Sequence, residues 1–189
     1  PPLCSQQALI KSKQRLVDFK DIVFFLFDKI LDDDIELAAV SQGKAGSADE
    51  ILGVDSDPVN AAAAEKIGLV DRLVGLEECV DGSDLIILSV PVGAAVKVLP
   101  QILDRFAMTD AAEKVVMDVC STKEHLAESV KYHPMRRCYV ASHPMSGTEY
   151  SGPWAALPGL FDGRACIICD REESSANAVR EVEKLYDTL

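Results

Sequence analysis

An apolar run, Leu85-Ile86-Ile87-Leu88-Ser89-Val90, constrains the fold of this chain more than any other feature. A strand with one solvated face alternates apolar and polar residues, whereas a strand buried on both faces is apolar throughout. Pro91 ends the run, and we expect a helix from Gly93 to Phe106. A doubly buried strand followed by a helix is typical of a parallel sheet with helices on both faces.

The same alternation of apolar strands and helical segments extends along most of the chain. Pro58 to Ile67 contains a run of alanines and is followed by Gly68, which predicts a helix and its end. Further expected strands are Ile22 to Phe25, Glu50 to Asp55, Val115 to Val119, Cys138 to Ser142 and Ala165 to Cys169. Further expected helices are Ile30 to Val40, Lys123 to Lys131 and Ser174 to Leu189. We therefore predict an α/β fold with a doubly wound, mostly parallel, Rossmann-like sheet.

Composition excludes several classes of function. The net charge is −12 over 189 residues, whereas a nucleic-acid surface needs clustered Lys and Arg. No apolar run approaches the roughly 20 residues that span a bilayer, and no signal peptide is visible. We therefore expect a cytoplasmic protein with neither a nucleic-acid nor a membrane partner.

The cysteine pattern indicates reduced core thiols. Six cysteines lie mostly in or beside apolar segments. Cys166 and Cys169 have C-x-x-C spacing, but side chains three apart on a strand point to opposite faces. We therefore predict no metal site.

Polar residues follow two of the predicted strands. Val115 to Val119 leads to Ser121, and Cys138 to Ser142 leads to His143 in a loop rich in Gly and Pro. Parallel strands end at one edge of a sheet, where open α/β folds bind ligands, so we expect Ser121 and His143 to lie together there. We also expect Ser121 to be able to cap the helix that follows it, a role that is compatible with a place in the site.

The first half of the chain has the order of a dinucleotide-binding unit: a strand, a turn, a helix and a second strand that ends at Asp55. A carboxylate there accepts hydrogen bonds from ribose hydroxyls and repels a 2′-phosphate, which favours NAD over NADP. At the first turn, however, Leu26, Asp28 and Leu31 occupy the three positions of the glycine pattern. Glycine there permits close approach of the pyrophosphate. Acidic residues follow this turn at Asp32, Asp33, Asp34 and Glu36. Two interpretations are open: their charges repel a bound diphosphate, or they only stabilise the N-terminus of a helix.

Several stretches carry a resemblance to a known family. They are Ile51–Asp55, Ala62–Asp71, Ser83–Gly93, Asp118–Lys123, His143–Pro153 and Leu160–Arg164. From Glu50 to about Arg171 the chain resembles the nucleotide-binding domain of prephenate dehydrogenases and the related arogenate dehydrogenases.

The resemblance implies NAD-dependent oxidative decarboxylation of prephenate or arogenate in tyrosine biosynthesis, with hydride transfer to the nicotinamide. By the motif match, His143 accepts or polarises the substrate hydroxyl proton, and Ser121 binds the same region and orients His143. Glu149 corresponds to an acidic residue to which we assign an electrostatic or gating role. The stretch that lines the adenosine side of the cofactor is matched by Ser89, Val90 and Pro91.

The polar and basic composition of residues 1–20, together with the resemblance, predicts a division of the chain. We expect a leader over residues 1–20, a Rossmann-like dinucleotide-binding domain over 21–172, and a helix over 173–189 that leads towards the family's helical C-terminal domain. We expect that domain, which supplies substrate-carboxylate binding and the dimer interface, to be missing here and the full-length protein to be a homodimer.

Two other interpretations remain open. The first is another Rossmann dehydrogenase that acts on a small hydroxy acid, which the block from His143 to Pro153 disfavours. The second is a degenerate Rossmann domain that has lost the dinucleotide and serves as a regulatory or interaction module. Its evidence is Leu26, Asp28 and Leu31.

Overall fold

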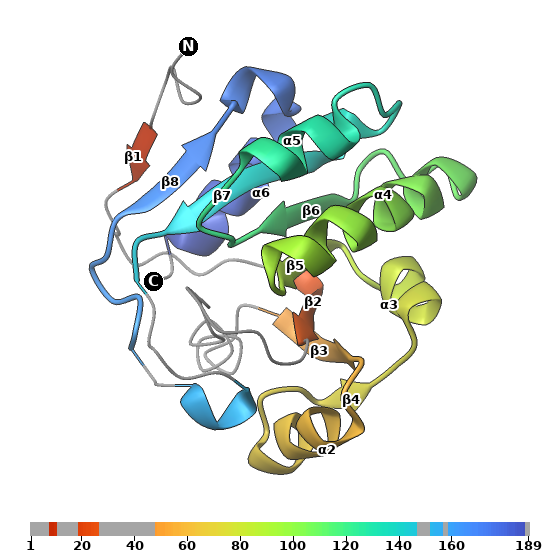
Figure 1. Cartoon of the computed structure of the whole chain (residues 1–189), viewed down its shortest axis with the longest axis vertical. Coiled ribbons are helices and arrows are strands. Elements are labelled where there is room, and N and C mark those ends of the chain that lie inside the picture. The colour runs from red at the N-terminus through yellow and green to blue at the C-terminus, as the bar shows by residue number, and fades with distance from the viewer. Residues whose placement is uncertain (1–7, 11–18, 27–47, 147–151, 157–158, 188–189) are drawn as a thin grey trace.

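The computed structural model describes residues 8–10, 19–26, 48–146, 152–156 and 159–187. Over these residues the strands form one eight-stranded sheet in the order β1-β8-β7-β6-β5-β2-β3-β4 (Figure 1). The strands are β1 (Ala8–Ile10), β2 (Phe19–Leu26), β3 (Ala48–Asp55), β4 (Arg72–Leu73), β5 (Leu85–Ser89), β6 (Val115–Asp118), β7 (Tyr139–Pro144) and β8 (Cys166–Cys169). The helices are α2 (Pro58–Ile67), α3 (Leu76–Gly82), α4 (Val92–Met108), α5 (Glu124–Val130) and α6 (Ala176–Tyr186), with short 3-10 turns η2 (Arg136–Cys138), η3 (Pro153–Ala155) and η4 (Arg171–Glu173).

The sheet is doubly wound about β2. Strand β2 pairs in parallel with β3 on one side and with β5 on the other, and β4, β6 and β7 continue the parallel pairing outwards. Strand β8 is antiparallel to both β7 and β1. The predicted α/β class and mostly parallel sheet are confirmed.

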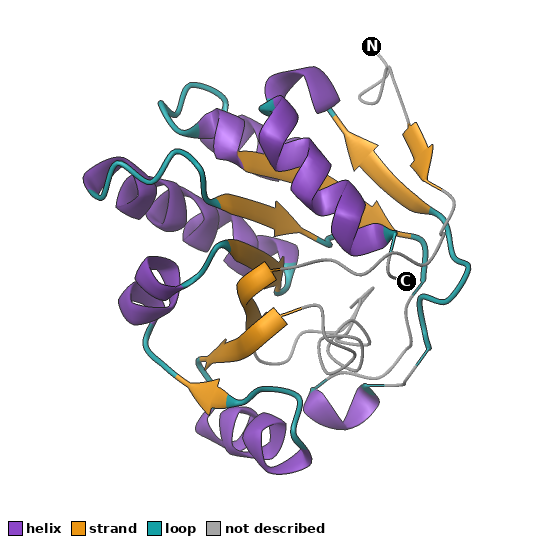
Figure 2. Ribbon diagram, turned by 180° about the vertical axis from the view of Figure 1, so that it is seen from behind, coloured by secondary structure: helices purple, strands orange, loops and turns teal. Residues whose placement is uncertain are grey.

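Helices cover both faces of this sheet and produce two cores. Alternate residues of β5 point to opposite faces, so Leu85 and Ile87 belong to one cluster and Ile86 and Leu88 to the other. Figures 1 and 2 view the sheet from opposite sides, with α4 and α5 on one face and α6 on the other. This two-sided burial explains why the run that defines β5 is apolar on both faces.

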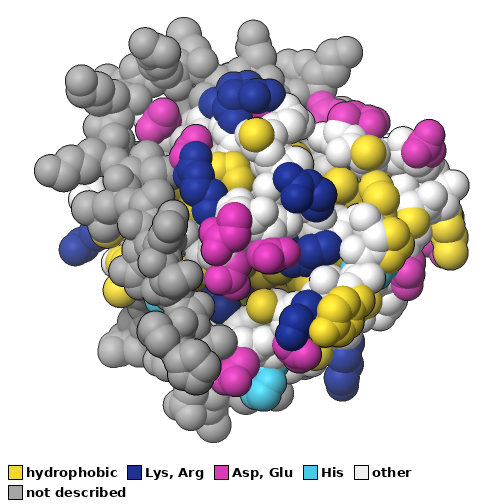
Figure 3. Space-filling view, turned by 90° about the horizontal axis from the view of Figure 1, so that it is seen from above, with side chains coloured by type: hydrophobic (Ala, Val, Ile, Leu, Met, Phe, Trp, Pro, Cys, Tyr) yellow, Lys and Arg dark blue, Asp and Glu magenta, His cyan; other side chains and the backbone are white. Residues whose placement is uncertain are grey.

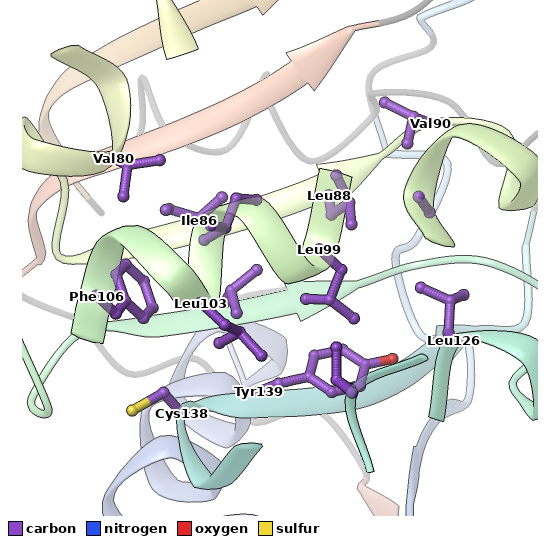
Figure 4. Packing of buried hydrophobic residues seen from close by; sticks show 14 of the residues in the cluster. Val80, Ile86, Leu88, Val90, Leu99, Leu103, Phe106, Leu126, Cys138 and Tyr139 are labelled. Carbon is purple, nitrogen blue, oxygen red and sulfur yellow. The ribbon is translucent and has the colours of Figure 1, made fainter. Parts of the chain in front are cut away.

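The larger cluster is built around α4. Figure 4 shows side chains of α4 packed over those of the central strands, among them Leu99, Leu103, Phe106, Ile86, Leu88 and Tyr139. Leu99, Leu103 and Phe106 are fully buried. Full burial of one such side chain contributes about 1.5–3 kcal/mol.

Helix α2 begins and ends where its sequence predicts. The Asp57 side chain accepts a hydrogen bond from the Val59 amide at 2.7 Å, and Pro58 occupies the first turn. Gly68 ends the helix with φ of 74°, a left-handed conformation that glycine adopts without steric cost. Both ends match the predicted boundaries.

Several elements differ from the sequence prediction. Ala8–Ile10, within the expected leader, forms β1 and pairs with β8, so this part of the chain belongs to the sheet instead. Strand β4 and helix α3 were not predicted. The helix expected over Ile30 to Val40 lies outside the described residues.

The described surface carries charged side chains of both signs. Figure 3 shows basic and acidic side chains interspersed on one face, without a continuous basic patch on that face. Among the described residues, no helix combines the length and the apolar character needed to cross a membrane.

Candidate active site at the carboxyl edge of the sheet

The carboxyl ends of five neighbouring strands form the candidate site. Leu26 at the end of β2 pairs with Asp55 of β3 on one side and with Ser89 of β5 on the other. Strands β6 and β7 continue the row. At about 4.8 Å per strand, β7 lies roughly 19 Å from β3 across four spacings. The row passes the point where the strand order reverses, beside β2, and such a switch point is where open α/β sheets bind ligands.

The β3 end of the row carries the candidate ribose-binding carboxylate. Asp55 is the last residue of β3, and its Oδ1 atom accepts a hydrogen bond from the Asp57 amide at 2.7 Å. Asp57 in turn caps α2. The short segment between strand and helix therefore holds Asp55 in place.

The carboxyl end of β5, the middle strand of the row, carries the predicted adenosine-side stretch. Ser89 is half-buried at the end of β5, and Pro91 is the N-cap of α4. Val90 is buried in the α4 cluster, and its carbonyl accepts a weak hydrogen bond from Cys120 Sγ at 3.4 Å. Val90 therefore contributes to the core, while Ser89 and Pro91 retain partial exposure.

The glycine-pattern positions are described only in part. Leu26 is the last residue of β2, between Asp55 and Ser89. Asp28 and Leu31 lie outside the described residues, as does Glu149.

His143 lies inside strand β7 and not in a loop after it. Its backbone pairs antiparallel with Ile167 of β8, which extends the strand beyond the predicted end at Ser142. Burial, and next the positive charge of Lys123, lower the pKa of His143, while the charge of Asp118 opposes them. A half-buried imidazole in this setting is neutral near pH 7 and can accept a proton.

A buried carboxylate lies at the carboxyl end of β6, the strand next to β7. Asp118, the last residue of β6, is fully buried. Its Oδ1 atom accepts a hydrogen bond from the Tyr139 hydroxyl at 2.7 Å, and its Oδ2 atom accepts one from the Cys120 amide at 3.0 Å. Lys123 Nζ forms an ion pair with Oδ2, and the lysine side chain is only 12% exposed. Desolvating a carboxylate is costly unless it is paired in this way.

The hydrogen-bond network continues through the sheet to α6. The Ser142 hydroxyl lies 2.6 Å from the backbone carbonyl of Asp118 and 2.7 Å from the Tyr186 hydroxyl. Burial raises the pKa of Tyr139 and that of Tyr186 well above the usual tyrosine value. Both hydroxyls therefore remain protonated donors at physiological pH.

Ser121 lies between Asp118 and α5, and it is half-buried. It does not cap α5, because the helix begins at Glu124 with Lys123 as its N-cap and no side-chain capping bond. The predicted capping role of Ser121 is therefore wrong. Since β6 and β7 are adjacent and Asp118 pairs with Ala141, Ser121 and His143 follow paired positions at one edge, as predicted.

The remaining histidines differ from each other. His125 is exposed. The Nε2 atom of His133 lies 3.1 Å from Asp104 Oδ1, and its Nδ1 atom accepts a hydrogen bond from the Met135 amide, so only 13% of the side chain is exposed. His133 thus has a structural place between α4 and η2.

The C-x-x-C pair has the predicted geometry. Cys166 belongs to the cluster under α6, and Cys169 belongs to the cluster under α4. Their side chains therefore point to opposite faces of β8. Among the described residues, no group of three or more His, Cys, Asp or Glu side chains is placed to hold a metal ion.

Asp118 and Tyr139 are the residues that sequence reasoning missed. The available signal was a carboxylate at the end of the apolar run Val115-Val116-Met117, with a lysine five positions later. A charged residue within a doubly buried strand requires a partner.

Comparison with known proteins identifies the family. The sequence model described as "Prephenate dehydrogenase, nucleotide-binding domain" matches residues 38–189. The chain belongs to this family. The match begins after Leu26, Asp28 and Leu31, so it does not include the glycine-pattern positions.

Curated relatives carry corresponding names. A prephenate dehydrogenase of Lactococcus lactis is 30% identical over 126 residues, which are 66% of this chain and 34% of that protein. The prephenate dehydrogenase of Bacillus subtilis is 28% identical over 137 residues, 71% of this chain and 36% of that protein. The chain thus spans about a third of the length of these relatives.

Solved structures share the fold. Prephenate dehydrogenase from A. aeolicus, in complex with hydroxyphenyl propionate and NAD+, superimposes with a TM-score of 0.71 at 19% identity, over 89% of this chain and 57% of that one. Synechocystis arogenate dehydrogenase gives 0.70 at 15% identity, over 89% and 58%. At these identities the similarity establishes the fold alone.

Proposed function

We propose that this chain is the NAD-binding and proton-accepting part of an enzyme that oxidatively decarboxylates prephenate or arogenate in tyrosine biosynthesis. The observation that carries the proposal is the arrangement of Asp55 and His143 at two ends of one carboxyl edge, on either side of the switch point. Asp55 would hold the adenosine ribose of a dinucleotide bound along this edge, and His143 would lie towards its nicotinamide.

The residues at the β3 end fit NAD. The Asp55 carboxylate is held by the Asp57 amide at the position where Rossmann enzymes bind the adenosine ribose. A negative charge there repels a 2′-phosphate, so we propose a preference for NAD over NADP. When bound, NAD supplies the hydride acceptor.

At the other end, His143 serves as the general base. Burial and the charge of Lys123 lower its pKa, so the imidazole is neutral and accepts the proton of the substrate hydroxyl. Ser121 hydrogen-bonds the same region of the substrate and orients His143. Oxidation of the ring carbon that bears the hydroxyl accompanies loss of the ring carboxylate as carbon dioxide.

The chain spans about a third of the length of its curated relatives. We propose that the enzyme binds the substrate carboxylate through a helical domain and acts as a homodimer. We place this enzyme in the cytoplasm, in line with the family resemblance. We keep a gating role for Glu149 within the same proposal.

Calorimetric titration of the chain with NAD, up to millimolar concentration, tests the proposal. We expect saturable binding, weaker binding of NADP, and a loss of the NAD preference in Asp55→Asn. The matched control Glu172→Gln alters an exposed acidic residue of η4 and should bind NAD like the parent chain. If a folded chain does not bind NAD, the cofactor assignment fails for this sequence.

A second candidate function is a degenerate Rossmann module. It rests on Leu26, Asp28 and Leu31 at the three glycine positions. The triple variant with glycine at these positions discriminates the two. Binding that appears only in the variant shows that the turn blocks the dinucleotide, whereas continued absence of binding shows a wider loss of the site.

A further inference from the structure

The ion pair between Asp118 and Lys123 is buried beside the candidate site. It lies at the end of β6, where Asp118 is fully buried and Lys123 is 12% exposed. Replacing a buried pair by neutral residues of similar volume is often neutral or stabilising, so burial alone does not explain two charges at this position.

The strand register places this pair on the same face of the sheet as His143. Asp118 pairs with Ala141 of the adjacent parallel strand, so their side chains leave the same face. His143 is two residues beyond Ala141 and shares that face. The intervening Ser142 points the other way, since its hydroxyl contacts Tyr186 of α6. The buried pair and the imidazole are thus neighbours on the α5 side.

Among the described residues, the other ionisable groups near the carboxyl end of β7 are either neutral or exposed, and Arg164, which precedes β8, is exposed. Burial raises the pKa of Cys166 on β8 to about 12 and also raises the pKa of Cys120. The tyrosines of β7 and α6, Tyr139 and Tyr186, likewise stay protonated. On α5, Glu124 and His125 are exposed, where solvent and salt screen their effect. Among the described groups on these elements, Asp118 and Lys123 are therefore the two buried charges beside the imidazole.

We propose that Lys123, anchored by Asp118, is a positioning residue that holds a fixed positive charge beside His143 and keeps the imidazole in its neutral, proton-accepting form. Asp118 fixes the ammonium group, which removes the flexibility of a free lysine side chain. The role of this charge rests on the proposed function of His143 as a base, but its electrostatic effect does not.

The test is an NMR titration of the His143 imidazole in this chain, without NAD or substrate. The chain has three histidines, and the signal of His143 is assigned by its loss in His143→Asn. Removing the positive charge in Lys123→Met should raise the pKa of His143 by about half a unit or more, and Lys123→Arg should leave it unchanged.

Variants of the carboxylate refine the expected order. Asp118→Asn alone leaves the positive charge and should lower the pKa of His143 below that of the parent chain. The double variant Asp118→Asn with Lys123→Met lacks both charges, so its His143 pKa should lie between those of the parent chain and Lys123→Met. Because neutral replacement of both partners avoids an unpaired buried charge, the double variant tests the proposal even if Lys123→Met does not fold.

The control is a second ion pair remote from the site. Arg105 Nη2 and Asp81 Oδ2 are 2.5 Å apart, between α4 and α3. Arg105→Met should leave the titration of His143 unchanged. The proposal is overturned if the pKa of His143 is unchanged both in Lys123→Met and in the double variant. It is also overturned if Lys123→Arg or Arg105→Met raises this pKa as much as Lys123→Met does. Since no cofactor is used, a failure of NAD binding does not affect this result.

Discussion

Removing one hydroxyl group, in Tyr139→Phe, tests the network around Asp118. The Tyr139 hydroxyl donates a 2.7 Å hydrogen bond to Asp118 Oδ1, and neither residue is exposed to solvent. A hydrogen bond to a charged group contributes about 1.5–3 kcal/mol. The substitution removes one oxygen from a ring that stays packed, so the cavity term is small. We therefore expect the free energy of unfolding to fall by about 2 kcal/mol.

Urea denaturation measures this change, and two other tyrosines calibrate it. Tyr186→Phe removes a bond of 2.7 Å between two neutral hydroxyls, which contributes about 0.5–1.5 kcal/mol. Tyr132 is 87% exposed, so Tyr132→Phe should change the free energy of unfolding by less than about 0.5 kcal/mol. The expected order of destabilisation is Tyr139, Tyr186, Tyr132. If Tyr139→Phe is as stable as Tyr132→Phe, the network does not stabilise the fold in the way argued.

Three further perturbations have expected outcomes. A Cβ atom at Gly53 would lie 2.9 Å from a methyl group of Val70, whereas a Cβ atom at Gly93 meets no atom within 4 Å. Gly53→Ala should therefore lower the free energy of unfolding by about 1–3 kcal/mol, measured by urea denaturation. The control Gly93→Ala should not lower it. Burial raises the pKa of Cys79 to about 12, so its peptide should carry no iodoacetamide label at about pH 8 until the chain is unfolded, and early labelling would contradict this. Burial lowers the pKa of His143 in the folded chain, so the unfolded chain binds more protons as the pH falls below about 6.5, and the free energy of unfolding decreases. His143→Asn should flatten this part of the pH dependence, measured by thermal denaturation, and an unchanged slope would assign it to other groups.

The fold followed from the sequence because its signals are local. A doubly buried strand must be apolar on both faces, and β5 is. The ends of α2 were predicted at Pro58 and Gly68 because proline and glycine have direct backbone consequences. The opposite orientation of Cys166 and Cys169 followed from the strand period alone.

Features that depend on long-range pairing were missed. Ala8–Ile10 forms an edge strand only because β8 offers it a partner more than 150 residues later. The same pairing partner explains why β7 continues through His143, since Ile167 extends the ladder beyond Ser142. Neither pairing has a local signature, because the hydrogen-bonding partner is distant in sequence.

Strand order gave the relative position of two candidate residues but not their buried neighbours. Ser121 and His143 were expected together at the carboxyl edge of the sheet, and they follow the paired strands β6 and β7. Their roles stay a prediction. The buried ion pair of Asp118 and Lys123 beside His143 was not predicted. Whether a lysine is a rim charge or a buried partner depends on the length and direction of the β6–α5 connection, and sequence spacing does not specify this.

Asp118 is expected to affect both the free energy of unfolding and the pKa of His143. Different substitutions separate these two effects. Tyr139→Phe weakens the network but leaves both charges of the Asp118–Lys123 pair in place. It should therefore destabilise the fold with little effect on the pKa of His143. Asp118→Asn removes a charge as well as hydrogen bonds, so it should change both quantities. If Tyr139→Phe shifts the titration of His143 as far as Asp118→Asn does, the imidazole responds to packing and not to the fixed charges beside it.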